Sequence, residues 1–227
     1  MTADDMKRAV GEAAADLVES GMTVGLGSGS TAAWFVRALC ARKLDLTCVA
    51  TSEATAALAR EGGLKVVDLD AVFRIDLTID GADEIGPGLV LIKGGGAALL
   101  REKLVWEASY RCVAIADDSK RAATFGTFPL PVEVVAYGHA TTARRIARAL
   151  EDSGYAAPCI LRGSTGAPLL TDGGNVIYDI AFGAIEDPEG VEALLKSLTG
   201  VVEHGLFIGL AERALIATAD GVVTLKP

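Results

Sequence analysis

Apolar residues along the first part of the chain repeat with two alternating periods. Residues 4–19 contain an apolar stripe at helical spacing, made of Met6, Val10, Ala14, Leu17 and Val18. This spacing predicts a helix, and Gly21 ends it. The apolar run 22–26 that follows is short and predicts a strand. The chain therefore begins with a helix and then enters a sheet.

Predicted helices and strands continue to alternate as far as residue 116. Further helices are predicted at 30–43, 52–61 and 97–109, and further strands at 46–51, 64–69, 74–79, 89–92 and 112–116. Ser52 is a suitable N-cap for the second of these helices, and Gly62-Gly63 ends it. Helices that alternate with β-branched runs predict a parallel sheet wound with helices.

The pattern changes near Pro129-Leu130-Pro131. Strands are then predicted at 132–136, 158–162, 175–181 and 201–207, with helices at 141–151 and 188–198. This β-α-β-β-α-β order is typical of a small ferredoxin-like unit, while residues 208–227 predict strands that return to the first sheet. We therefore predict an α/β fold: a Rossmann-like wound parallel sheet in residues 1–128 plus 208–227, and a smaller ferredoxin-like α+β lid or oligomerisation domain in 129–207.

Composition narrows the class of protein. The chain has 227 residues, of which 51% are apolar, and a chain of this length buries roughly 70% of the surface that it exposes when unfolded. A net charge of −9 argues against non-specific binding to nucleic acid, although a local basic pocket can still hold an anionic substrate. No run of 18 apolar residues occurs. These limits suit a soluble enzyme with no nucleic-acid or membrane partner.

The cysteines do not follow a metal-binding pattern. They are Cys40, Cys48, Cys112 and Cys159. No two of them form a C-x-x-C pair, and only His139 and His204 are present to complete a zinc site. We therefore expect buried thiols and no metal. Residues 1–10 have no apolar segment of the kind found in signal peptides, so we expect a cytoplasmic protein.

A glycine- and serine-rich loop joins the predicted strand 22–26 to the next helix. Its sequence is Gly25-Leu26-Gly27-Ser28-Gly29-Ser30-Thr31. Glycines let backbone N–H groups approach a ligand, and the helix start that follows attracts a phosphate. Ser30 occupies the third glycine position of a dinucleotide-binding loop, and no lysine precedes it as in a Walker loop. The loop therefore predicts either a monophosphate site or a plain strand–helix turn.

Polar residues also end other predicted strands. Ligands of open parallel sheets bind outside the carboxyl ends of the strands, so we expect Asp80 and Asp83 in the same crevice as the loop. An Asp-Gly turn with solvated carboxylates is the alternative. Thr51-Ser52 either adds hydroxyls to the same rim or only caps the next helix.

A lysine, three glycines and a glutamate follow within the next twenty residues. Lys93 ends an apolar strand, and the tract 94–96 allows a polar ligand to approach the backbone closely. Glu102 lies early in the predicted helix 97–109, where it is either a base or only a partner of the helix dipole. Two carboxylates, a lysine and a glutamate around a phosphate loop predict proton transfer on a phosphorylated sugar. Lys7 and Lys120 are candidate phosphate partners or surface lysines.

In their order along the chain, these segments resemble ribose-5-phosphate isomerases of the A type. The matching runs are Gly-Leu-Gly-Ser-Gly-Ser-Thr-Ala-Ala at 25–33, Ala-Thr-Ser at 50–52, Asp-Gly-Ala-Asp-Glu at 80–84, Lys-Gly-Gly-Gly-Ala-Ala-Leu at 93–99, Arg-Glu-Lys at 101–103, Asp-Asp-Ser-Lys at 117–120, Leu-Pro-Val-Glu-Val at 130–134, Thr-Asp-Gly-Gly-Asn at 171–175 and Gly-Leu-Phe at 205–207. Ala136-Tyr137 and Gly163-Ser164-Thr165 depart from the family pattern, away from the residues of the chemistry.

The resemblance implies interconversion of D-ribose 5-phosphate and D-ribulose 5-phosphate in the non-oxidative pentose phosphate pathway, without metal or organic cofactor. It implies that Glu102 is the proton acceptor, and that Lys93, Asp80 and Asp83 take part in catalysis. The substrate contacts that it implies are Ser28, Gly29, Ser30, Thr31, Asp80, Gly81, Ala82, Asp83, Lys93, Gly94, Gly95, Gly96, Lys120 and, less directly, Lys7. It also implies a homodimer or homotetramer.

Two other functions use similar sequences. A non-catalytic sugar-phosphate sensor of a transcriptional regulator needs the loop at 28–31 but no base, and it usually has a helix-turn-helix, which is not evident before Gly21. A CoA transferase of related fold uses a glutamate as nucleophile but has no obvious need for both a phosphate loop and Lys93. The sequence does not distinguish which aspartate opens the sugar ring.

Overall fold

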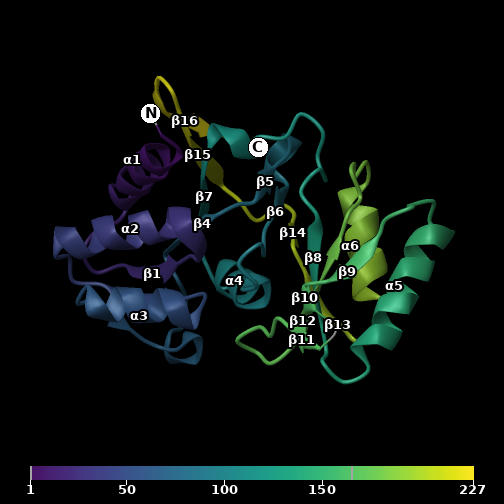
Figure 1. Ribbon diagram of the computed structural model, residues 1–227. Coiled ribbons are helices and arrows are strands. Elements are labelled where there is room, and N and C mark those ends of the chain that lie inside the picture. Colours follow the sequence, from purple (N-terminus) through teal and green to yellow (C-terminus); the bar gives the residue numbers. More distant parts are fainter. Residues whose placement is uncertain (1, 165) are drawn as a thin grey trace. The chain divides into compact units, whose positions relative to one another are not determined.

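The computed structural model describes residues 2–164 and 166–227, so Thr165 lies outside the described residues (Figure 1). The chain divides into two compact units. The larger unit comprises Met1–Ala82, Arg101–Arg121 and Gly209–Pro227, and the smaller unit comprises Asp83–Leu100 and Ala122–Ile208. Residues 83–100 and 122–128, which the sequence analysis assigned to the first domain, therefore cluster with the smaller unit.

A seven-stranded sheet forms the centre of the larger unit, in the order β16-β15-β7-β4-β1-β2-β3. Its strands are β1 Thr23–Leu26, β2 Thr47–Ala50, β3 Lys65–Val66, β4 Leu77–Gly81, β7 Cys112–Asp117, β15 Arg213–Thr218 and β16 Gly221–Leu225. All neighbours are parallel except the edge strand β16, which is antiparallel to β15. The predicted wound parallel sheet is thus confirmed, as is the return of the C-terminal strands to it.

Helices cover both faces of this sheet. They are α1 Ala3–Ala15, α2 Gly29–Arg42, α3 Glu53–Glu61 and α4 Leu99–Glu107, with the 3-10 turns η1 Leu69–Ala71 and η3 Asp118–Lys120. On one face Val10 of α1 and Phe35 of α2 pack in one core cluster with Leu26. On the other face Val105 of α4 packs with Val49. Cys48 of β2 belongs to the first cluster and the next residue, Val49, to the second, so alternate residues of this strand face different helices.

The two ends of α1 show how the local sequence sets the limits of a helix. The hydroxyl of Thr2 accepts a hydrogen bond from Asp5 N, and the carboxylate of Asp5 accepts one from Thr2 N, which makes a capping box for α1. The helix ends at Ala15, earlier than the predicted residue 19, and the guanidinium of Arg42 donates to the carbonyls of Ala15 and Val18. The apolar stripe continues past Ala15, but the backbone there forms tighter i to i+3 bonds, from Leu17 N to the carbonyl of Ala14 and from Val18 N to that of Ala15.

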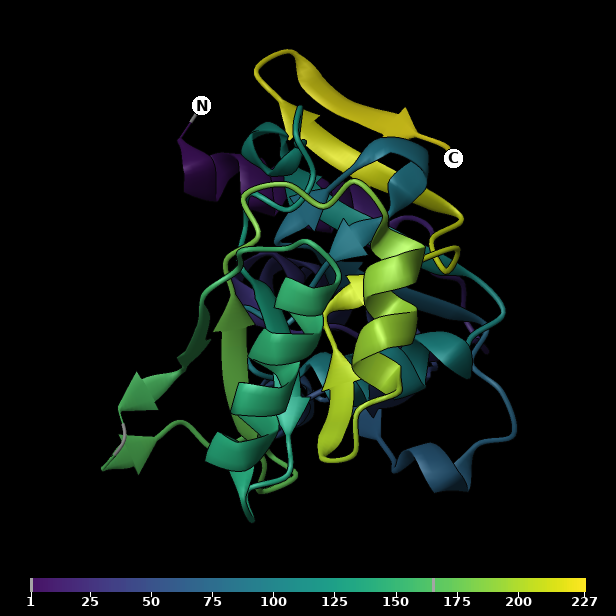
Figure 2. The same cartoon turned by 90° about the vertical axis from the view of Figure 1, so that its right-hand side faces the viewer.

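The smaller unit contains a four-stranded antiparallel sheet in the order β13-β8-β12-β9. Its elements are β8 Leu130–Val134, α5 His139–Asp152, β9 Cys159–Leu161, β12 Val176–Ile180, α6 Pro188–Lys196 and β13 Val201–His204. Figure 2 shows α5 and α6 on one face of this sheet, where Ile146 and Leu195 share a core with Val132. The predicted ferredoxin-like order is present, with a small hairpin of β10 Gly163–Ser164 and β11 Ala167–Pro168 added after β9.

The strand that precedes Lys93 is not part of the parallel sheet, contrary to the sequence analysis. Here β6, Leu91–Ile92, lies between β5, Glu84–Ile85, and β14, Leu206–Phe207, and it is antiparallel to both; the 3-10 turn η2, Pro87–Leu89, joins β5 to β6. A Cβ on Gly205 would lie 2.2 Å from the carbonyl oxygen of Lys93, so a glycine is needed where these strands meet. This long-range pairing has no signal in the local sequence.

In the described part of the chain, no helix is long and apolar enough to cross a membrane. The four cysteines are free; Cys48 and Cys112 are buried, and the other two are half-buried. Burial raises the pKa of the Cys48 thiol from 9.0 to about 12. Cys48 is therefore a core side chain rather than a reactive thiolate.

We expect Cys48 to resist alkylation at pH 8 in the folded protein, because a pKa near 12 leaves on the order of one thiolate in ten thousand, against about one in ten at the ordinary value. Iodoacetamide labelling followed by peptide mass spectrometry should find it at least about 100-fold slower than in urea. The half-buried Cys40 is the internal comparison. Equal labelling rates in folded and unfolded protein would contradict this reading.

Candidate active site

The carboxyl ends of four parallel strands gather the polar residues of the larger unit. Leu26 at the end of β1 is paired with Ala50 of β2 and Ile79 of β4, and Gly81 of β4 is paired with Ile115 of β7. The loop 27–31, Thr51-Ser52, Asp80-Gly81 and Lys120 therefore follow strands that end at one edge of the sheet. This is the edge at which open α/β sheets bind their ligands.

The backbone of the loop after β1 depends on two glycines. A Cβ on Gly27 would lie 2.2 Å from Oδ1 of Asp80, so only glycine fits against that carboxylate. Gly29, the first residue of α2, has a φ of +90°, which other residues rarely adopt. The N–H groups of the first turn of α2 have no partner within the helix, so they are suited to an anion.

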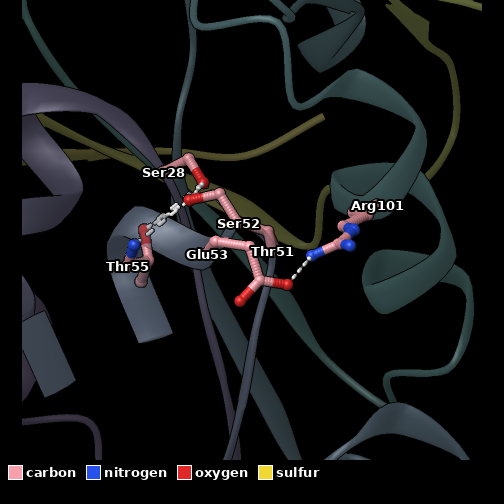
Figure 3. Close-up of polar contacts among 6 residues, drawn as sticks. All are labelled: Ser28, Thr51, Ser52, Glu53, Thr55 and Arg101. Carbon is pink, nitrogen blue, oxygen red and sulfur yellow. Dashed lines mark hydrogen bonds and ion pairs between the residues drawn. The ribbon is translucent and has the colours of Figure 1, made fainter. Parts of the chain in front are cut away.

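The hydroxyl of Ser28 is held from the neighbouring strand end (Figure 3). Ser28 Oγ lies 2.7 Å from Oγ1 of Thr51 and 2.9 Å from Oγ of Ser52, within hydrogen-bond distance of both. Ser52 also caps α3, since its Oγ accepts from Thr55 N at 3.2 Å. Both readings of Thr51-Ser52 from the sequence thus hold together. Ser28 itself makes no side-chain cap to α2.

Two lysines of the larger unit occupy different positions around this edge. Lys7 of α1 donates from Nζ to Oγ of Ser30 at 2.9 Å, which brings a positive charge to the loop. Lys120 is half-buried and ends η3, directly after β7. The turn before Lys120 is fixed by Asp117, whose Oδ1 accepts from Ser119 N at 3.1 Å. Lys7 is therefore a partner of the loop rather than an unrelated surface lysine.

Asp80 lies completely buried beneath the loop. Its Oδ1 accepts from the N–H of Ser28 at 2.9 Å and of Gly81 at 2.7 Å. Its Oδ2 accepts from Nε1 of the buried Trp106 at 3.3 Å. Asp80 thus connects the end of β4, the loop after β1 and helix α4. Gly81 and Ala82, which follow it, are half-buried.

Glu102 lies in the first turn of α4, as the sequence predicted, and its side chain is only 5% exposed. The guanidinium of the neighbouring Arg101 forms an ion pair at 2.7 Å with Glu53 at the start of α3 (Figure 3). Lys103 is buried as well, which the sequence did not indicate. A carboxyl group at this position is shielded from bulk water, which strengthens its electrostatic interactions with neighbouring groups.

A pocket of about 400 Å³ lies beside these residues within the larger unit. Its lining includes Ser52, Glu53 and Arg60 of α3 and its N-cap, and Arg101 and Leu104 of α4. The Glu53–Arg101 ion pair therefore lies at the wall of an open volume between α3 and α4 (Figure 3).

Asp83 and Lys93 face each other in the smaller unit. Glu84 of β5 is paired with Ile92 of β6, so Asp83, one residue earlier, is opposite Lys93, one residue later. The amide of Asp83 donates to the carbonyl of Ile92 at 2.9 Å. The sequence assigned these residues to two strand ends of the parallel sheet; instead, a short hairpin brings them together.

Lys93 is buried with a 2% exposed fraction. Its Nζ lies 5.4 Å from the centroid of the Phe207 ring, within the range of a cation–π contact. Its backbone N–H donates to the carbonyl of Gly205 at 2.9 Å. A lysine held in this way at a strand end is unlike a solvated surface lysine.

The glycine tract after Lys93 forms a turn that is fixed by polar contacts. Gly94 has a φ of +100°, and its carbonyl accepts from Ala97 N at 2.9 Å. The exposed Gly95 donates its N–H to Oδ2 of Asp83 at 2.7 Å. A Cβ on Gly95 would lie 2.6 Å from Oδ1 of Asp83, and for Gly96 nothing among the described atoms lies within 4 Å of that position. Glycine is therefore needed at position 95 because the Asp83 carboxylate lies too close for a Cβ, and at position 94 because of its positive φ.

The expected site residues thus fall into two sets. The larger unit holds Lys7, Ser28, Gly29, Ser30, Thr31, Asp80, Gly81, Ala82, Glu102 and Lys120, and the smaller unit holds Asp83, Lys93, Gly94, Gly95 and Gly96. Sequence reasoning missed Trp106 and the burial of Lys103, since a single Trp or Lys in a helix gives no sign of its partner. Among the described residues, no three His, Cys, Asp or Glu side chains are grouped to hold a metal ion.

Comparisons with known proteins agree on one family. The family model of ribose 5-phosphate isomerase A (phosphoriboisomerase A) matches residues 47–221, and a model of the DeoR C terminal sensor domain matches only residues 2–69. Ribose-5-phosphate isomerase A of Caulobacter sp. strain K31 is 61% identical over 227 residues, which is 100% of both chains. This full-length similarity supports the isomerase rather than the sensor or the CoA transferase.

Solved structures lead to the same family. Ribose 5 phosphate isomerase A from Neisseria gonorrhoeae has a TM-score of 0.91 at 34% identity, covering 100% of this chain and 98% of that chain. A D-ribose-5-phosphate isomerase in complex with phospho-erythronic acid has a TM-score of 0.92 at 33% identity, with 100% of both chains covered. The family model, the full-length relatives and the solved structures agree, so this chain belongs to the ribose-5-phosphate isomerase A family.

Proposed function

We propose that this isomerase interconverts D-ribose 5-phosphate and D-ribulose 5-phosphate, with Glu102 as the group that moves the proton. The reaction transfers hydrogen between C2 and C1 of the sugar through an enediolate. One carboxylate can serve both carbons when they present the same face to it. The observation that carries this proposal is the burial of Glu102 in the first turn of α4, in a chain of this family.

The loop after β1 is the proposed phosphate site. Its support is the combination of a helix N-terminus, the residues Ser28, Gly29, Ser30 and Thr31, and the ammonium of Lys7 at Ser30. Lys120 is proposed as a second cation for the phosphate. A firmly held phosphate lets binding energy far from the reacting carbons fix their position.

Lys93 is the proposed partner of the negative charge that develops on the enediolate oxygen. A buried ammonium stabilises such a charge more than a solvated one, because little water screens it. Asp83 and Asp80 receive different roles. Asp80 is buried and accepts hydrogen bonds from Ser28, Gly81 and Trp106, so we assign to it the support of the loop. The half-buried Asp83 is then the carboxylate that orients sugar hydroxyls and assists ring opening.

The enzyme is further proposed to act as a homodimer or homotetramer in the cytoplasm, as a step of the non-oxidative pentose phosphate pathway. Free thiols at all four cysteines suit a reducing compartment. The exposed Phe73 and Tyr137 are apolar surface of the kind that subunit contacts cover. Light scattering coupled to gel filtration should give two or four times the 23.4 kDa chain mass; a 23.4 kDa particle at micromolar concentration would contradict the proposal.

The activity itself is tested by incubating ribose 5-phosphate with the protein in D₂O. A proton carried by a carboxylate exchanges with solvent, so we expect deuterium in the sugar carbon by NMR as ribulose 5-phosphate appears. Interconversion without any label would show that hydrogen moves without exchange with solvent, and the Glu102→Gln variant then decides whether a carboxylate carries it. Absence of reaction, or reaction only after CoA is added, would contradict the isomerase.

We expect Glu102→Gln to lower kcat by at least about 100-fold, because the amide keeps the shape of the side chain but cannot accept the proton. Steady-state kinetics give kcat, and the inhibition constant of inorganic phosphate should remain within a factor of about three, since the proposed phosphate site does not include Glu102. Glu107→Gln at the exposed end of the same helix is the control and should behave as the parent. Near-normal turnover of Glu102→Gln would assign the base to another residue.

We expect Lys93→Met to lower kcat by about 100-fold with little change in KM, because the ammonium acts on charge that develops only in the transition state. Methionine keeps most of the buried volume, and circular dichroism checks that the fold is retained. Lys65→Met, on an exposed position of β3, is the matched control. A rise in KM with unchanged kcat would make Lys93 only an anchor for substrate.

A further inference from the structure

Arg162, directly after β9 in the smaller unit, forms a bidentate ion pair with Asp179. Its Nε donates to Oδ2 of Asp179 at 2.9 Å, and its Nη2 donates to Oδ1 at 2.5 Å. The side chains are only 16% and 25% exposed. Asp179 lies on β12, and the amide of Arg162 donates to Ile177 of the same strand at 2.8 Å. The guanidinium is thus held rigidly on the sheet of the smaller unit.

The remaining nitrogen of the guanidinium reaches the glycine tract. Arg162 Nη1 donates to the carbonyl of Gly94 at 2.9 Å and to that of Gly95 at 3.2 Å. The donors of a guanidinium lie in one rigid plane, so the two hydrogen bonds to Asp179 fix the position of Nη1. An ion pair that only stabilised the sheet would not require these two further contacts.

The contact with the carbonyls also fixes the direction of two amides. In a trans peptide, the C=O and the N–H of the next residue point to opposite sides, and the described chain has no cis peptide. The carbonyl of Gly94 points at Arg162, so the N–H of Gly95 points away from it, where it donates to Oδ2 of Asp83 at 2.7 Å. By the same geometry, the N–H of Gly96 is turned away from Arg162.

A contiguous path therefore leads from Asp179 through Arg162 and Gly94-Gly95 to Asp83, entirely within the smaller unit. Three successive glycines have many backbone conformations to lose, and Gly95 and Gly96 are exposed. An exposed glycine turn needs an external partner to keep one conformation. Arg162 supplies that partner from a rigid strand rather than from the turn itself.

We propose that Arg162, oriented by Asp179, is a positioning residue of the isomerase: it fixes the Gly94–Gly96 turn and, through the Gly95 amide, the carboxylate of Asp83. The inference rests on the proposed roles of Asp83 and of the glycine tract. Arg162 has no contact with substrate in this proposal. Misplacement of a positioned group by about 1 Å can lower the rate by about 100-fold.

The first test compares Arg162→Lys and Arg162→Ala with Arg148→Ala. Arg148 belongs to the same unit and also faces an aspartate, Asp152 at 3.8 Å, but both side chains are exposed, so Arg148→Ala should keep parental kinetics. We expect kcat to fall about 10-fold in Arg162→Lys and about 100-fold in Arg162→Ala, with KM and phosphate inhibition within a factor of about three. Arg162→Lys keeps a cation at Asp179, so it tests the proposal even where the alanine variant fails to fold.

The second test does not depend on activity. Amide hydrogen exchange of Gly95, followed by ¹⁵N NMR, should be at least about 10-fold faster in Arg162→Lys than in the parent, while amides of α5 and β12 exchange as before. Added guanidinium should restore part of kcat in Arg162→Ala. Unchanged exchange at Gly95 would overturn the proposal, and so would a loss of thermal stability with parental kcat. An inactive parent with fast exchange in the variant would instead indicate that the proposed function, not the positioning, is wrong.

Discussion

The site of the larger unit depends on the hydrogen bonds that the buried carboxylate of Asp80 accepts. A carboxylate without access to water is unfavourable unless donors replace the lost hydration. Donors from different segments do so, among them the amides of Ser28 and Gly81 and the indole of Trp106. The same contact explains Gly27, because any Cβ there would collide with Oδ1. The loop conformation, the end of β4 and the position of α4 are thus set together.

The smaller unit uses a comparable arrangement around a backbone turn. Asp83 binds the amide of Gly95, and Arg162 binds the carbonyls on the other side of the same turn. Lys93, at the base of the turn, is held by the pairing of β6 with β14 and by the ring of Phe207. In both units a charged side chain orders a glycine segment that would otherwise be flexible, so the sites are built from backbone geometry as much as from reactive groups.

Local pattern was enough to predict most elements and the order of the site segments. The alternation of periods located α2, α3 and β7 to within two residues, and Ser52 was recognised as a cap. The partition of the chain was harder. The strand before Lys93 has the composition of a buried strand, and its pairing with β5 and with Leu206-Phe207, more than a hundred residues later, separates it from the parallel sheet. Arg162 and Trp106 likewise depend on contacts distant in sequence.

The division of the chain has a consequence for the chemistry. The chain first leaves the larger unit between Ala82 and Asp83 and returns between Leu100 and Arg101, so these first two crossings lie within three residues of a proposed catalytic group. The proposed base belongs to the larger unit, and the proposed ammonium and ring-opening carboxylate belong to the smaller one. Under the proposals made above, Asp80 in the larger unit affects how the phosphate is held, and Arg162 in the smaller unit affects turnover. Kinetic constants therefore distinguish the role of Asp80 from that of Arg162, although each side chain makes polar contacts with a glycine turn.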